Sequence, residues 1–130
     1  MKIKHTERGW GGHFICANRC RFRRNTLLES DTQQIVVSTV GLMEDYRDKT
    51  CTKFETIGFD RYYETMAFFS DPEDHRYHDI DVTREIGFKS PWAIAEIDAD
   101  DRANDMHEVV VKELTRKMKT GTVTDEDGKP

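Results

Sequence analysis

Residues 61–88 read RYYETMAFFSDPEDHRYHDIDVTREIGF and contain two extended runs separated by a polar turn at residues 70–74. In the second run, the apolar side chains share one parity and lie at Ile80, Val82, Ile86 and Phe88. This period of two predicts a strand with one buried and one acidic face. The first run, residues 62–69, is apolar on both parities. It therefore predicts a central strand that is covered on both faces.

The rest of the chain up to this hairpin predicts more strands. They are expected at residues 13–17, 20–28, 35–40 and 54–57. The run IVVSTV is the most β-branched of them and predicts a buried strand. We expect a tight turn at residues 18–19 and a charged connection at residues 44–50. Because the strands follow one another across short polar turns, the sequence predicts an antiparallel meander.

A helix of about 17 to 19 residues is predicted to begin at Asp100 or Asp101 and to end before Gly121. Its apolar side chains recur at three- and four-residue steps and are Ala103, Met106, Val110, Leu114 and Met118. Carboxylates lie early and basic residues late, which suits the helix dipole. Residues 92–97, which follow Ser90-Pro91, fit either a helical turn or a short strand. The predicted fold is α+β, an antiparallel β-sheet meander with one C-terminal amphipathic helix packed on a face.

The chain has 130 residues, which is the size of one domain. We expect a single domain over residues 1–120 and a flexible tail over residues 121–130, which are polar. Three cysteines are an odd number, and the first residues lack the apolar core of a secretory signal, so we expect a reduced, cytoplasmic protein. Apolar runs are far shorter than the ~20 residues that cross a bilayer, so no membrane span is expected.

Charge is distributed unevenly along the chain. Residues 1–25 carry a net charge of +6, which leaves −11 on the other 105 residues of a chain whose net charge is −5. The carboxylates predicted to bind a partner are Asp79, Asp81, Glu85, Asp98, Asp100, Asp101, Asp105 and Glu108. A surface this acidic repels nucleic acid and attracts a basic protein groove, although such residues also serve solubility alone.

The basic segment offers a second candidate surface. The residues predicted to bind a phosphate or nucleotide are Trp10, Arg19, Arg21, Phe22, Arg23 and Arg24. Arginines can hold phosphates while an aromatic ring stacks on a base. The alternative is that these arginines pair with the protein's own carboxylates.

Candidate metal ligands are weaker. His13, Cys16 and Cys20 have spacings that suit zinc, but a strand at residues 13–17 would point His13 and Cys16 to opposite faces. His75 and His78 lie next to Asp79 and Asp81, a set that suits a metal or general acid-base pair, and also a solvated hairpin tip. There is no phosphate-binding glycine loop and no Gly-x-Ser-x-Gly elbow. We therefore predict no cofactor and no catalytic residue.

Several strings of this sequence resemble a group of small uncharacterised proteins encoded by bacteriophages and prophages. The strings are RGWGGHFIC (residues 8–16), RFRRNTL (21–27), IVVSTVG (35–41), RYYETMAF (61–68), SPWAIAE (90–96) and NDMHE (104–108). The resemblance implies no known activity or site residue. It implies a context, an accessory protein made in an infected host cell, where small acidic proteins often bind a host enzyme.

Three functional hypotheses remain open from the sequence. The leading one is a binding protein that occupies a host or phage macromolecule stoichiometrically, for example a nucleic-acid-handling or antiviral defence complex. The alternatives are a nucleotide or nucleic-acid binder that uses residues 19–24, and a small metal-dependent enzyme. A two-sided apolar strand in so polar a chain is also compatible with a homodimer.

Overall fold

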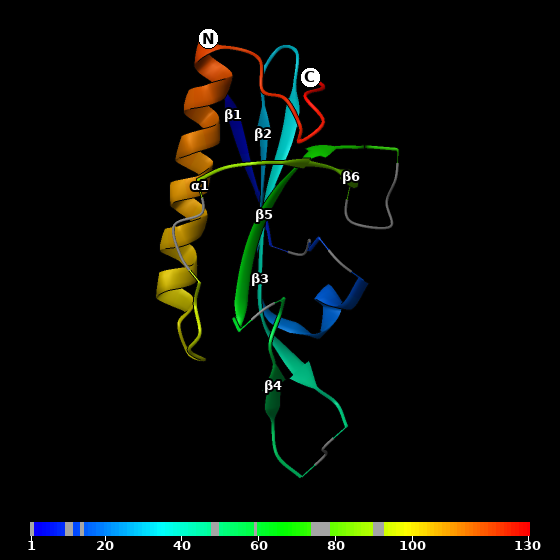
Figure 1. Cartoon of the computed structure of the whole chain (residues 1–130), viewed down its shortest axis with the longest axis vertical. Coiled ribbons are helices and arrows are strands. Elements are labelled where there is room, and N and C mark those ends of the chain that lie inside the picture. Colours follow the sequence, from blue (N-terminus) through cyan, green and yellow to red (C-terminus); the bar gives the residue numbers. More distant parts are fainter. Residues whose placement is uncertain are drawn as a thin grey trace.

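The computed structural model describes residues 2–9, 12–13, 15–47, 50–58, 60–73, 79–89 and 93–130, with only the backbone of residues 15 and 16. The elements are β1 (Lys4–Arg8), the 3₁₀-helix η1 (Ile15–Arg19), β2 (Cys20–Glu29), β3 (Gln34–Asp45), β4 (Lys53–Glu55), β5 (Tyr63–Ser70), β6 (Ile80–Ile86) and α1 (Asp100–Thr120). The strands form one antiparallel sheet in the order β1-β2-β3-β5-β6, and β4 pairs with the end of β3 (Figure 1). The predicted α+β meander with one C-terminal helix is confirmed.

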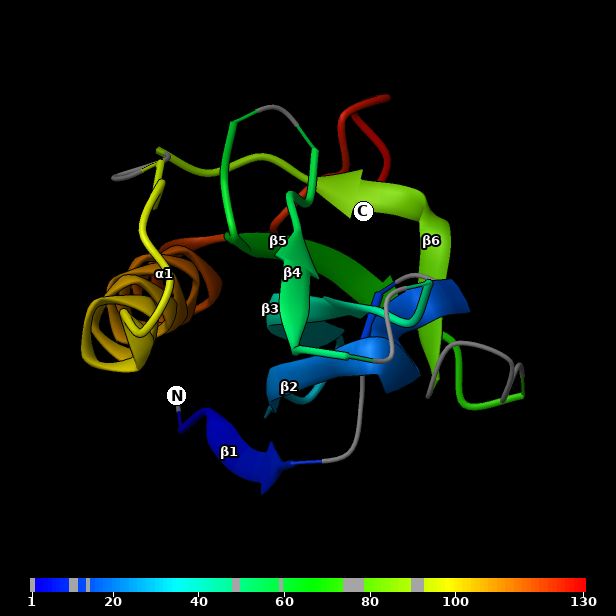
Figure 2. The same ribbon diagram turned by 90° about the horizontal axis from the view of Figure 1, so that it is seen from below.

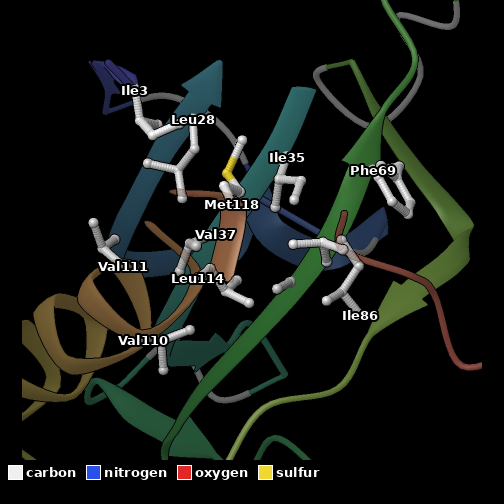
Figure 3. Close-up of a cluster of buried hydrophobic side chains, with 12 residues drawn as sticks. Ile3, Leu28, Ile35, Val37, Phe69, Ile86, Val110, Val111, Leu114 and Met118 are labelled. Carbon is white, nitrogen blue, oxygen red and sulfur yellow. The ribbon is translucent and has the colours of Figure 1, made fainter. Parts of the chain in front are cut away.

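Helix α1 covers one face of the sheet, as the view along the strands shows (Figure 2). The main core lies between them (Figure 3). It consists of Ile3, Leu28, Ile35, Val37, Ala67, Phe69, Ile86, Val110, Val111, Leu114, Met118 and Val123. Strand residues of one parity therefore meet helix residues spaced three and four apart, as the two periodicities predict.

Strand β5 lies between β3 and β6 and is buried on both faces, which confirms its predicted interior position. Phe69 faces α1, whereas Phe68 packs with Val36 and Ile80 on the other face. Val82 of β6, predicted to be buried, is 36% exposed. The β5–β6 register shifts between Phe68 and Ser70, and this irregularity changes the parity of the first half of β6.

Residues 13–17 were predicted as a strand, and this prediction is wrong because residues 15–19 form η1. Ala17 and Cys20 are both buried in one cluster with Val40 and Ile57. A separation of three residues places side chains on the same side of a 3₁₀ turn, whereas in a strand it would place them on opposite faces. The charged connection predicted at residues 44–50 is also shorter, because β3 continues to Asp45.

Helix α1 begins at Asp100 and ends before Gly121, as predicted, with 21 residues, longer than the predicted 17 to 19. Before it, Ile94 forms an isolated antiparallel bridge with Tyr63, so this segment pairs as a short strand would. Among the described residues, no helix is long and apolar enough to cross a membrane.

Residues 121–130, predicted to be a flexible tail, make defined contacts with the sheet. Val123 is buried in the main core, and the Asp125 carboxylate lies 2.9 Å from Arg84 Nε. The Glu126 amide donates a hydrogen bond to the Glu85 carbonyl at 2.9 Å. These contacts join the segment to the domain, and its flexibility stays a prediction about motion.

Candidate functional site

Two of the arginines predicted to bind phosphate are paired with carboxylates near the β3–β4 end of the sheet. Arg19 Nη2 lies 2.7 Å from Glu55 Oε2, and its Nε donates to the Glu44 carbonyl at 2.9 Å. Arg21 Nε lies 2.5 Å from Glu44 Oε1. Each of these guanidinium groups would have to give up a carboxylate of its own chain before it could bind a phosphate.

Arg24 is paired with two carboxylates on the helix-covered face. It bonds Glu7 on β1, with Nε to Oε1 at 2.7 Å, and it also bonds Glu108 on α1. Burial lowers the pKa of Arg24, but the hydrogen bonds that it donates to Glu7 and Glu108, together with the charges of these carboxylates, outweigh burial and raise it. Three elements that are distant in sequence are therefore joined through one guanidinium group.

Phe22 is the aromatic residue of the predicted nucleotide surface that the structure describes, and its ring packs against another ring of the protein. Phe22 is half-buried and packs edge-to-face on Tyr63, with ring centroids 5.7 Å apart. Trp10 lies outside the described residues. Arg23 is half-buried and makes no ion pair with a described residue. Of the six residues predicted to bind phosphate or nucleotide, only Arg23 retains an uncompensated charge in the part of the chain that the structure describes.

Of the predicted zinc ligands His13, Cys16 and Cys20, the structure describes the side chains of His13 and Cys20. Cys20 is buried in an apolar cluster, and the side chain of Cys16, like His75 and His78, lies outside the described residues. Both ring nitrogens of His13 are within hydrogen-bond distance of other side chains. No group of three or more His, Cys, Asp or Glu side chains in the described part of the chain is arranged to hold a metal ion.

His13 belongs instead to a buried Ser-His-Glu network that the sequence did not predict. Its Nε2 lies 2.8 Å from Glu64 Oε1 and its Nδ1 lies 2.9 Å from Ser38 Oγ. Hydrogen bonding from His13 lowers the pKa of Glu64 despite burial, and Arg61 lowers it further. A serine nucleophile must reach substrate, but Ser38 is 0% exposed. We therefore interpret the network as structural.

His107 forms a second buried network, on the opposite face of the sheet. Thr26 donates to Glu7, so its oxygen accepts a hydrogen bond from His107 Nε2 at 2.8 Å. His107 Nδ1 then accepts from Thr39 at 2.8 Å, and Thr39 lies 2.6 Å from Thr65. Burial, together with the charge of Arg24, lowers the pKa of His107 to about 4. His107 is therefore neutral at pH 7 and links α1 to the sheet.

The predicted acidic surface divides into two parts. On and next to β6, Asp79 lies 3.5 Å from Arg8, and Asp81 accepts hydrogen bonds from Thr83. Burial raises the pKa of Glu85, and the neighbouring carboxylate of Glu126 raises it further. The carboxylates of this part are therefore engaged with other groups of the protein.

The other acidic part lies at the start of α1 and contains uncompensated charge. Asp98, Asp101 and Asp105 are exposed, and none forms an ion pair with a residue that the structure describes. Ile97 beside them is 47% exposed. Asp100 differs, because it accepts a hydrogen bond from the Tyr63 hydroxyl at 2.7 Å. We call Ile97, Asp98, Asp101 and Asp105 the acidic patch.

A search with family models, a search of curated proteins and a search of solved structures each find no match for this chain.

Proposed function

We propose that this protein is a non-enzymatic binding protein that occupies a basic surface of a host or phage protein through the acidic patch. The supporting observation is the contrast between two charged surfaces. The arginines at positions 19, 21 and 24 are compensated by carboxylates of the same chain, whereas Asp98, Asp101 and Asp105 are exposed and unpaired among the described residues.

The chemistry of the acidic patch suits a cationic partner. Exposed carboxylates attract a basic groove over a distance of about one Debye length, ~8 to 10 Å at physiological salt. A partner that covers the exposed Ile97 side chain would remove apolar surface from water, which favours binding. A groove that normally holds a phosphate backbone is basic, so a nucleic-acid-handling or defence complex is the class of partner that we propose. The resemblance to phage-encoded proteins supports the same context.

Capture from a bacterial lysate tests this function. Immobilised protein should retain a protein partner in a 1:1 ratio at low salt and release it at about 1 M salt, where the Debye length is only ~3 Å. If immobilised protein retains nothing above background at either salt concentration, the proposed function is contradicted.

A further inference from the structure

The outward face of α1 carries a charge pattern that is complementary to itself. Its exposed residues at three- and four-residue steps are Asp101, Asp105, Val109, Lys112, Arg116 and Lys119. At 100° per residue these positions fall within an arc of about 80°, so they form one stripe. We call these six residues the helix stripe. Carboxylates occupy its first half, cations its second half, and Val109, 42% exposed, lies near its middle.

We propose that a second copy of this chain binds the helix stripe, so that two α1 helices pack antiparallel about a two-fold axis near Val109. In an antiparallel pair centred between positions 108 and 109, position i of one helix lies opposite position 217 − i of the other. Asp101 then lies opposite Arg116, and Asp105 lies opposite Lys112. One register therefore brings both acids against both cations, and the two-fold axis repeats each pair.

The helix dipole alone does not explain this pattern. The dipole favours acids in the first turn and cations in the last turn, and it fades beyond them. Asp105 and Lys112 lie inside a helix that runs from Asp100 to Thr120, outside both end turns. The dipole therefore does not account for the order of these two charges.

Repulsion within the single helix also favours a second copy. Asp101 and Asp105 are separated by four residues, as are Lys112 and Arg116, and like charges at this spacing destabilise a helix by about 0.2 to 0.5 kcal/mol per pair. None of these four residues has an ion-pair partner among the described residues. The opposite charges of a second helix would relieve both repulsions and would cover Val109.

The chemistry of the contact predicts a weak dimer that is sensitive to salt. It consists of exposed ion pairs and one apolar residue per chain, which places it in the class of small interfaces. Asp101 and Asp105 also belong to the acidic patch, so self-association and capture of a basic partner should exclude each other. The dimer does not rest on the proposed function, because purified protein alone is enough to test it.

Charge reversal tests the register. In sedimentation velocity at low salt, over about 10 to 500 µM protein, the wild type should associate. D105K and K112D should each weaken the association constant about tenfold or more, because each variant places two repulsive pairs in the symmetric dimer. The double variant D105K/K112D should restore association to within about threefold of wild type. D31K, which changes an exposed charge outside α1, is the matched control and should have no effect.

A cysteine placed near the axis gives a second, independent readout. In a C51S background, V109C should form an intermolecular disulfide on mild oxidation, whereas V82C, at an exposed valine on β6, should not. A wild type that stays monomeric throughout this concentration range at low salt would overturn the proposal. A double variant that associates no better than the single variants would also overturn it.

Discussion

Acidification should destabilise the fold through His107. Burial holds the pKa of this imidazole at about 4 in the folded protein, against 6.5 as its ordinary value. Below pH 6.5 the unfolded chain binds a proton there that the folded chain does not bind. Stability is therefore complete above pH 6.5 and is lost as pH falls toward 4.

The size of the effect follows from these two pKa values. Integrating the proton-linkage relation from pH 7 to pH 5 gives a loss of about 2 kcal/mol in the free energy of unfolding. Glu7 and Glu64 are among the carboxylates with lowered pKa values; they titrate below their ordinary 4.5 and contribute mainly at lower pH. The pKa of Glu85 is raised, so this carboxylate acts in the opposite direction as pH falls, and a variant of His107 is needed to isolate the histidine contribution.

Urea unfolding at pH 7, 6, 5.5 and 5 measures the loss in the wild type and in H107Q, whose side chain does not titrate in this range. We expect the pH slope of the wild type to be steeper than that of H107Q, by up to about 1.4 kcal/mol per pH unit. Equal slopes, or a His107 ring that titrates near pH 6.5 by NMR, would refute the reasoning.

Three further substitutions or deletions test the packing. In G41A the new Cβ would lie 2.2 Å from the buried Tyr63 ring. We therefore expect the free energy of unfolding, measured with urea, to fall by about 1 to 3 kcal/mol. An unchanged unfolding midpoint would contradict this close approach. Deleting residues 122–130 removes Val123 from the main core and should lower the free energy of unfolding by about 2 kcal/mol. Deleting a freely flexible tail would leave it unchanged. S38A removes the hydroxyl that lies within hydrogen-bond distance of His13 and should lower the free energy of unfolding by about 1 to 3 kcal/mol. Labelling of Ser38 in the wild type by a fluorophosphonate probe would contradict its structural role.

Local sequence patterns predicted the elements whose burial follows a simple period. Three elements occupy their predicted places: the β-branched run at residues 35–40, the run at 62–69 that is apolar on both faces, and the buried apolar face of α1. Periodicity was misleading where the backbone departs from a regular strand. The register shift at Phe68 and Ser70 exposes Val82, and no composition signal marks it.

The candidate site depended on tertiary contacts that a single sequence does not report. Arg24 and Glu108 are separated by 84 positions, so the compensation of the arginines was only an alternative until the fold placed α1 over β2. Both histidine networks likewise join residues from different elements. By contrast, the sequence predicted that carboxylates gather at the start of α1, because a helix period and acidic residues are both readable along the chain, but it did not show which of them are unpaired.

The most direct test of the account compares the affinity of the captured partner for matched charge variants at one low salt concentration. D101K/D105K, which reverses the acidic patch, should weaken binding about tenfold or more, whereas D31K/E73K, which makes the same charge change elsewhere, should leave it within about threefold. K112D, which leaves the acidic patch intact and breaks only the dimer, should bind as well as wild type or better. Equal weakening by both double variants would show that net charge alone attracts the partner, and this would contradict a specific docking surface on α1.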